Sequence, residues 1–335
     1  MRPLFAQRTA LLAALSMALL ASPAAAADGA GATFPAPLYA RWAAAWAREA
    51  GNGEMHEIRY QPIGSTAGIE RITRGEVDFG ASDIPLAPEE LQRRGLVQFP
   101  VVIGGVVPVI HVDGIGPAEL KLDGRLLAAI YLGQVRKWND PRIAALNPDL
   151  SLPSSRITVV RRADGSGTTR LWREYLALSD PAARDDAAWQ TGVAATGNEG
   201  VAATVQRTRM AIGYVESSYA MQHRLNMAAL RNHDGLPAVP SRPAFEAATE
   251  GLDWTALPAA QPPLLDRPGT QTWPIVGASF ILLPAQATPR TQQVLAFFGW
   301  ALHHGQGLAM QQDYVPLPPE AVAGVEALWR ERYAP

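Results

Sequence analysis

Short apolar runs of strand length alternate along this chain with segments whose apolar residues recur at helical spacing. The strands expected from this pattern are residues 57–63, 77–82, 157–160, 211–216 and 275–283. The expected helices open at residues 35, 65, 88, 128, 142, 167, 200 and 290, the last running to residue 308. In the first of them Leu38, Trp42, Ala45 and Trp46 form one apolar stripe. The alternation predicts an α/β fold with mostly parallel sheets.

One apolar segment, residues 100–112, departs from this alternation. It contains Gly104, Gly105 and Pro108, which argue against a helix and for a buried extended segment. The chain is also longer than one hydrophobic core usually organises, so we expect two lobes with this segment crossing between them. Residues 258–269, rich in proline, are expected to form a long connecting loop.

Residues 1–27 have the pattern of an export signal. Arg2 and Arg8 provide the positive start, residues 10–20 the short apolar core, and residues 23–27 the small residues of a cleavage zone, with the cut expected after Ala26 or Ala27. The apolar core is too short to cross a bilayer. The chain has no cysteine for a lipid anchor or a disulfide. We therefore expect a free, soluble protein of the periplasm or the exterior.

The charge balance and the motifs exclude several classes of function. Without the predicted signal the chain carries 27 basic and 31 acidic residues, a net charge of about −4, which disfavours binding to nucleic acid or anionic lipid. No GxxxxGK[ST] loop is present, so the chain is not expected to hydrolyse ATP.

The most informative feature is a strand that ends in small residues and opens a helix. Residues 157–160 lead through Arg162 and Asp164 into Gly165-Ser166-Gly167-Thr168, which begins an amphipathic segment. A helix start leaves backbone N–H groups unpaired and carries partial positive charge. Small residues let an anion approach those groups, and hydroxyls add donors. This junction therefore predicts an oxyanion site.

Two further junctions have the same character. Residues 57–63 run into Gly64-Ser65-Thr66-Ala67-Gly68, and Gly29-Ala30-Gly31-Ala32-Thr33-Phe34 opens the first helix, with Thr33 as a reasonable N-cap. Each junction alone is equally compatible with an ordinary capped helix. In α/β folds, however, ligands bind at the carboxyl ends of strands, which is where all three junctions fall.

Asp83, at the end of the strand 77–82, is the residue that would select the ligand. An ionised aspartate only accepts hydrogen bonds, so beside an anion it is sensible if the anion carries a proton, as hydrogen phosphate does. Sulfate would present only lone pairs and be rejected by orders of magnitude. The alternative is that Asp83 merely caps the following segment.

Arg162 and Asp164 lie two residues apart beside the glycine-rich turn. They are interpreted as a salt link that aims the guanidinium at the ligand and offsets its charge. An exposed ion pair of little consequence is the alternative.

At these residues the chain closely resembles the periplasmic phosphate-binding proteins (PstS type) of phosphate ABC importers. The matching stretches are residues 29–37, 64–72, 77–83, 98–107, 130–153, 159–169, 197–206 and 211–216. The resemblance implies a type II-like periplasmic-binding-protein fold, in which two α/β lobes are joined by a hinge and close on phosphate. We place residues 28–108 and 277–335 in the first lobe and 109–276 in the second.

The resemblance also implies roles for individual residues and for partners. Thr33 and Phe34 would give backbone amides, Thr33 also a hydroxyl, and Ser65 a hydroxyl and an amide. Asp83 would accept the ligand proton. Arg162 would pair with both phosphate and Asp164. Ser166, Gly167 and Thr168 would complete the cradle. The protein would be a monomer and would need no cofactor. It would deliver phosphate to the permease and ATPase subunits of an importer.

Two positions depart from the family pattern. A glycine-rich, lysine-bearing loop is replaced by Val193-Ala194-Ala195-Thr196, which removes a cationic lip from the second lobe. Ile84 is bulkier than the usual small residue, so packing under the site is expected to differ.

Rival functions remain open from the sequence. Ser65 or Ser166 could serve a secreted serine hydrolase or phosphatase, although neither lies in a Gly-x-Ser-x-Gly elbow. Carriers of arsenate, sulfate or molybdate are the other alternative, and arsenate shares the proton of phosphate. His303 and His304 are adjacent, whereas metal-binding pairs are usually four residues apart, so they are interpreted as a solvated face.

Overall fold

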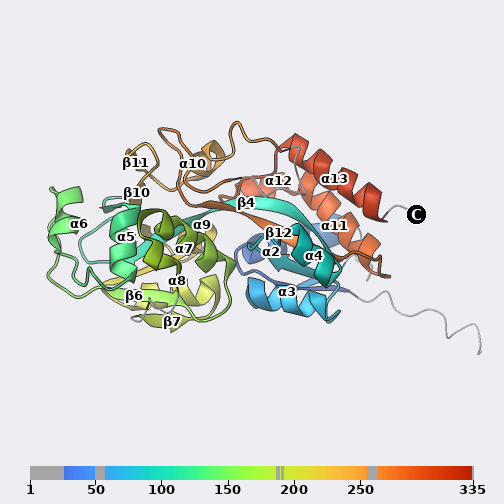
Figure 1. The fold of residues 1–335 in the computed structure, drawn as a ribbon, viewed down its shortest axis with the longest axis horizontal. Helices are drawn as coiled ribbons and strands as arrows, with labels where there is room; N and C mark the ends of the chain where they lie inside the picture. Colours follow the sequence, from blue (N-terminus) through green and yellow to red (C-terminus); the bar gives the residue numbers. More distant parts are fainter. Residues whose placement is uncertain (1–25, 50–56, 186–188, 190–191, 255–262, 334–335) are drawn as a thin grey trace, which may run out of the picture.

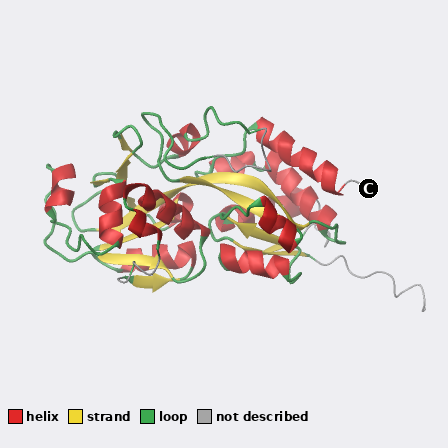
Figure 2. Cartoon of the chain, viewed as in Figure 1, coloured by secondary structure: helices red, strands yellow, loops and turns green. Residues whose placement is uncertain are grey.

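The structure is a computed structural model that describes residues 26–49, 57–185, 189, 192–254 and 263–333. Two α/β lobes share one mixed sheet, which helices cover (Figure 1, Figure 2). The strand order is β2-β1-β3-β12-β4-β8-β6-β7, with β9 pairing beside β4. The predicted α/β class is therefore confirmed.

The first lobe is built on three parallel strands that come early in the chain. They are β1 (Ala27–Gly31), β2 (Ile58–Pro62) and β3 (Phe79–Ser82), and the late strand β12 (Val276–Pro284) runs antiparallel to β3. Its helices are α2 (Ala36–Glu49), α3 (Ser65–Thr73), α4 (Pro88–Arg94), α11 (Thr291–His304), α12 (Gln306–Met310) and α13 (Pro319–Tyr333). Leu38, Trp42 and Ala45 of the predicted stripe are buried, and Trp46 packs against the same core.

The second lobe has parallel strands in β6 (Thr158–Arg162), β7 (Val193–Ala195) and β8 (Ala211–Glu216). Its helices are α5 (Gly124–Tyr131), α6 (Pro141–Leu146), α7 (Gly167–Ser179), α8 (Gly197–Arg207), α9 (Ser217–Gln222), α10 (Arg242–Ala247) and the short 3₁₀ helix Pro181–Arg184. A small separate sheet joins β11 (Pro237–Ala238), β10 (Ala229–Arg231) and β5 (Lys121–Leu122), and β9 is Asn226–Met227.

One long strand, β4 (Leu96–His111), links the lobes. Its first part pairs with β12 as far as Gly105, and from Val106 onward it pairs with β8. The expected extended crossing is thus confirmed. The chain crosses in β4 and returns in β12, so these two strands are antiparallel, and the parallel pairs lie outside them. The sheet therefore contains more antiparallel strand pairs than the expected, mostly parallel arrangement.

Two element boundaries differ from the sequence-based expectation. The helix expected over residues 290–308 is divided at Gly305 into α11 and α12. The Gly305 carbonyl accepts from the Trp42 Nε1 atom at 2.9 Å in addition to the Ala309 amide at 3.1 Å. Ala27, assigned to the signal, is instead the first residue of β1, and its amide donates to the Glu57 carbonyl at 3.0 Å. Residues 1–25 and 255–262 lie outside the described residues.

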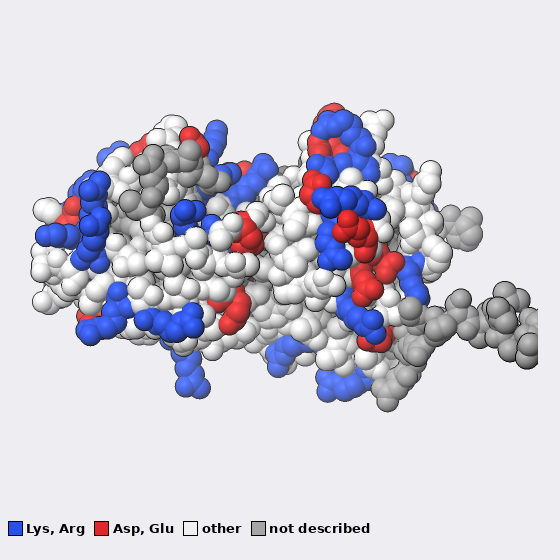
Figure 3. Space-filling model, turned by 90° about the horizontal axis from the view of Figure 1, so that it is seen from below, with Lys and Arg blue, Asp and Glu red and all other residues white. Residues whose placement is uncertain are grey.

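The surface carries charges of both signs. In the view of Figure 3, basic and acidic side chains interleave over the first lobe. Ion pairs along α3 and α4, such as Arg74 with Glu70 and Arg94 with Glu90, contribute to this mixture. Within the described residues, no helix has both the length and the apolarity needed to cross a membrane.

Candidate anion-binding site

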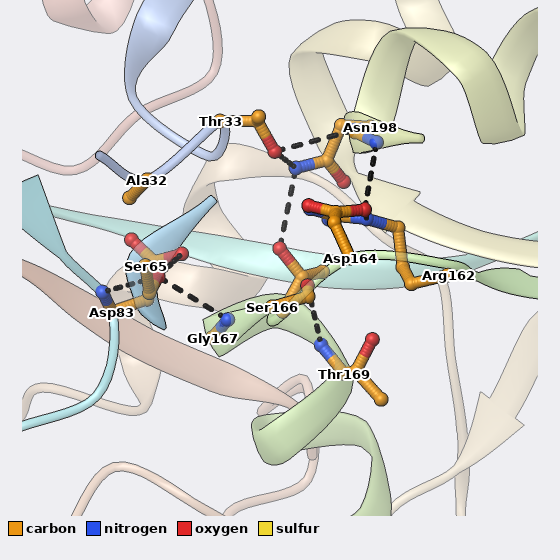
Figure 4. Close-up of polar contacts among 12 residues, drawn as sticks. Ala32, Thr33, Ser65, Asp83, Arg162, Asp164, Ser166, Gly167, Thr169 and Asn198 are labelled. Carbon is orange, nitrogen blue, oxygen red and sulfur yellow. Dashed lines mark hydrogen bonds and ion pairs between the residues drawn. The ribbon is translucent and has the colours of Figure 1, made fainter. Parts of the chain in front are cut away.

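The three junctions meet between the two lobes. The Thr66 amide, in the first lobe, donates to the Gly165 carbonyl of the second lobe at 3.2 Å. Gly64, with φ of 97°, faces the same turn, and a β-carbon there would lie 2.7 Å from the Asp164 Oδ2 atom. The Thr33 Oγ1 atom accepts from the Asn198 amide at 3.2 Å (Figure 4). Segments that are far apart in the sequence thus form one site.

Ser65 and Asp83 form the first-lobe side of this site. The Ser65 Oγ atom accepts from the backbone amides of Asp83 and of Gly167, each at 3.2 Å. It thereby joins β3, α3 and the start of α7. The Asp83 carboxylate is almost fully buried and accepts from the Ser279 hydroxyl at 2.9 Å through Oδ1. Ser279 lies on β12 and was missed by the sequence analysis.

Burial raises the pKa of Asp83 to about 7. Hydrogen bonds from Ser279 and Ser65 and the nearby charge of Arg162 act in the opposite direction without cancelling it. Near neutral pH a large share of this carboxyl group is therefore still ionised, and in that form it only accepts hydrogen bonds. Asp83 does not cap the next helix, because α4 begins at Pro88 and its N-cap is Ala87.

Arg162 and Asp164 form a buried pair rather than a surface one. The Arg162 side chain is 1% exposed, and its Nε atom donates to Asp164 Oδ1 at 2.8 Å while Nη2 pairs with Oδ2. Burial opposes ionisation of Asp164, but the hydrogen bond and charge of Arg162 and the Gly197 amide hold its pKa below the usual value. Nη1 of Arg162 is buried and has no hydrogen-bond partner among the described residues. One charged donor is thus left for a ligand.

The start of α7 supplies the second-lobe cradle. Ser166 is the N-cap, and its hydroxyl oxygen accepts from the Thr169 amide at 3.1 Å. Gly167 and Thr168 form the first turn, where amides have no intrahelical acceptor. Thr168 is buried, and its Oγ1 atom accepts from the Asn198 side chain at 3.2 Å.

Asn198 connects both lobes and was not singled out from the sequence. Its Nδ2 group donates to Thr33 Oγ1 at 2.8 Å as well as to Thr168, and its Oδ1 atom accepts from the Glu216 amide at 3.0 Å. Asn198 lies in the stretch 197–206 that resembled the phosphate-binding proteins, which is the signal that could have found it. The Thr33 hydroxyl therefore takes part in a contact between the lobes.

The two candidate serine nucleophiles have other partners. Ser65 accepts two amide hydrogens, and Ser166 caps α7. Four histidines have partners elsewhere, in the contacts His111–Val205, His223–Glu199, His233–Asp266 and His303–Glu326. The described residues contain no group of three or more side chains suited to hold a metal. The arrangement is a set of donors around one carboxylate, which suits a tetrahedral oxyanion that carries a proton.

Comparisons with known proteins agree with this geometry. A family model for the PBP superfamily domain matches residues 21–303. The phosphate-binding protein PstS of Haemophilus influenzae is 44% identical over 310 residues, which cover 90% of this chain and 92% of that protein. PstS of Pasteurella multocida is 42% identical over 333 residues, covering 97% and 96%. This chain belongs to the PstS family.

A solved structure extends the likeness to the fold of PstS proteins. It is that of a putative phosphate ABC transporter substrate-binding protein with bound phosphate, from Clostridium perfringens, with a TM-score of 0.65 at 18% identity. The match covers 88% of this chain and 100% of that one. At such low identity the likeness supports the two-lobed fold alone.

The two departures from the PstS pattern lie at the rim of the site. Val193 and Ala194 are exposed residues of the edge strand β7, which pairs with β6 through Val160 and Arg161. Ile84 is half-buried and lines a cavity of about 430 Å³ together with Arg161 and Arg170. Neither position lies within the hydrogen-bonded cluster around Asp83.

Proposed function

We infer that this protein captures inorganic phosphate between its two lobes for an ABC-type phosphate importer. It is a substrate-binding transport protein, not an enzyme, as its membership of the PstS family implies. The observation that carries the inference is the buried cluster in which Arg162 Nη1 has no hydrogen-bond partner among the described residues and Asp83 is the acceptor. A protonated phosphate satisfies both groups at once.

We propose that eight residues bind phosphate. Amides come from Thr33, Phe34 and the start of α7, and hydroxyls come from Thr33, Ser65, Ser166 and Thr168. Asp83 accepts the ligand proton, and Arg162 donates through Nη1 while Asp164 holds its other two nitrogens. The full set is Thr33, Phe34, Ser65, Asp83, Arg162, Ser166, Gly167 and Thr168, with Asp164 behind Arg162.

The proposed lobe division is residues 28–108 with 277–335, and residues 109–276. It is supported by the change of partner along β4 between Gly105 and Val106. Phosphate would touch both lobes only when they are closed, so it shifts the open–closed equilibrium by its difference in affinity for the two states. Direct contacts between the lobes, such as Asn198 with Thr33, belong to the closed state.

We also propose an export route and partner subunits for this protein. The protein is exported to the periplasm by a cleavable signal without a lipid anchor, and it passes phosphate to permease and ATPase subunits as a monomer. Because Ala27 pairs within β1, the signal would end at Ala26 rather than Ala27.

Tryptophan fluorescence titration with phosphate, arsenate and sulfate tests the function. Phosphate and arsenate are expected to bind, and sulfate is expected to bind at least about 1,000-fold more weakly, because it leaves Asp83 without a proton to accept. Tight sulfate binding would contradict the role of Asp83. Steady release of phosphate from an aryl phosphate would instead indicate a phosphatase.

A further inference from the structure

Three consecutive backbone carbonyls at the end of β1 each accept a hydrogen bond from a tyrosine hydroxyl. Tyr60 donates to the Ala32 carbonyl at 2.6 Å, and Tyr219 donates to the Thr33 carbonyl at 2.6 Å. Tyr314 donates to the Phe34 carbonyl at 2.7 Å. The three tyrosines come from three separate parts of the chain: β2, α9 and the segment after α12. The backbone of residues 32–34 is thus held on its carbonyl side.

Holding a carbonyl also fixes the amide that follows it. A trans peptide is planar, and its C=O and N–H groups point in opposite directions. The Ala32 carbonyl shares its peptide with the Thr33 amide, and the Thr33 carbonyl shares its peptide with the Phe34 amide. Tyr60 therefore orients the Thr33 N–H, and Tyr219 orients the Phe34 N–H. The Phe34 carbonyl precedes Pro35, which has no amide hydrogen, so Tyr314 only anchors the segment.

Both oriented amides are buried donors without an acceptor. Thr33 is 5% exposed and Phe34 is fully buried. Across the described ranges, neither amide donates a hydrogen bond to a protein acceptor. Buried N–H groups are almost always paired, so this arrangement is one that a ligand completes.

We propose that Tyr60 and Tyr219 are positioning residues that aim the Thr33 and Phe34 amides at phosphate. The proposal rests on the proposed function, because it takes phosphate as the acceptor of the two amides. A donor that is already aimed loses little conformational freedom on binding, so each tyrosine raises affinity without touching the ligand. In Figure 4, Thr33 lies beside Asn198 and Ala32 lies near Ser65.

The two tyrosines differ in when they act. Tyr60 belongs to the same lobe as residues 32–34, so its hydrogen bond is available in both the open and the closed state. Tyr219 follows β8 in the second lobe, so its bond to Thr33 forms only on closure. Tyr60 thus prepares one donor in advance, and Tyr219 adds the other as the lobes close. Burial raises the pKa of both phenols, so each keeps its proton at neutral pH.

The test uses Tyr60→Phe and Tyr219→Phe in the mature protein, with inorganic phosphate as the ligand. Each variant is expected to raise the Kd about tenfold, the effect of one lost hydrogen bond. For Tyr219→Phe the change is expected in the dissociation rate, because its bond forms after encounter. Tyr333→Phe is the matched control: it removes a tyrosine-to-carbonyl bond of 2.7 Å, to Pro284, outside the site, and should leave the Kd unchanged.

A site-specific signal separates positioning from general loosening. In ¹⁵N–¹H spectra of the phosphate complex, Tyr60→Phe should move the Thr33 amide resonance most, and Tyr219→Phe the Phe34 resonance. Unchanged Kd values and amide positions in both variants, with tight phosphate binding by the wild type, would overturn the positioning proposal alone. A wild type that does not bind phosphate would overturn the proposed function itself.

Discussion

Gly167 and Asp83 approach each other so closely that a β-carbon on Gly167 would lie 2.6 Å from the Asp83 β-carbon. It would also lie 2.7 Å from the Ser65 hydroxyl oxygen. These residues come from different lobes, so the contact brings the start of α7 against the proton acceptor. Only glycine fits there.

Gly167→Ala is therefore expected to weaken phosphate binding by about 10- to 100-fold, the range of an overpacked contact of about 1–3 kcal/mol. Isothermal titration measures the effect. Gly307→Ala is the control, because no atom lies within 4 Å of a β-carbon there. A Gly167→Ala protein that binds as tightly as the wild type would mean that the lobes need not approach this closely.

Asp83→Asn is expected to reduce discrimination between phosphate and sulfate by about tenfold or more. The asparagine amide can donate to a sulfate oxygen, whereas the aspartate repels it. Competition titrations with both anions measure the ratio. Asp78→Asn, at the opposite end of β3, is the matched control and should leave selectivity unchanged. Equal selectivity in Asp83→Asn and the wild type would show that Asp83 does not discriminate between phosphate and sulfate.

Arg162→Lys is expected to weaken phosphate binding by roughly 10- to 100-fold with the positive charge retained. A lysine cannot pair with Asp164 through two nitrogens and still present a third to the ligand. Arg142→Lys is a matched control, since Arg142 pairs with Asp140 across the same two-residue spacing on an exposed surface. Unchanged affinity in Arg162→Lys would show that Nη1 does not contact phosphate.

Stability without phosphate should fall as the pH rises from about 5 to about 7. Burial raises the pKa of Asp83 and of Glu216 to about 7, so the folded protein keeps protons that the unfolded chain has released. Where the folded state binds more protons, raising the pH destabilises it, by at most about 1.4 kcal/mol per pH unit for each group.

Thermal unfolding in phosphate-free buffer measures this dependence in the wild type and in Asp83→Asn. The variant should show a smaller decrease, because only Glu216 still contributes. A melting temperature that rises with pH over this range in both proteins would contradict the assignment.

Strand ends were predictable from the sequence because their chemistry is local. Small residues after an apolar run indicate a helix start, and the junctions at Gly64 and Gly165 were found in this way. The pairing of Arg162 with Asp164 was also visible, since only Ala163 separates them. The burial of this pair could not be predicted, because it depends on how distant parts of the chain pack around it.

The contacts that complete the site join distant segments. Ser279 reaches Asp83 from a strand that has no polar signal beyond one serine, and Asn198 was hidden in an ordinary helix start. The tyrosines that donate to the carbonyls of residues 32–34 come from three distant parts of the chain. No regular spacing in the sequence therefore indicates that they lie together. The bond from Trp42 to the Gly305 carbonyl likewise joins opposite ends of the chain.

The continuity of β4 has a mechanical consequence. The strand exchanges one partner for another directly after Gly104 and Gly105, and a β-carbon on Gly104 would lie 2.9 Å from the Phe34 ring. Any bending of the strand at this glycine pair would press on or release that ring. Phosphate bound to the Phe34 amide, as proposed above, would therefore also stiffen this stretch of β4 between the two lobes.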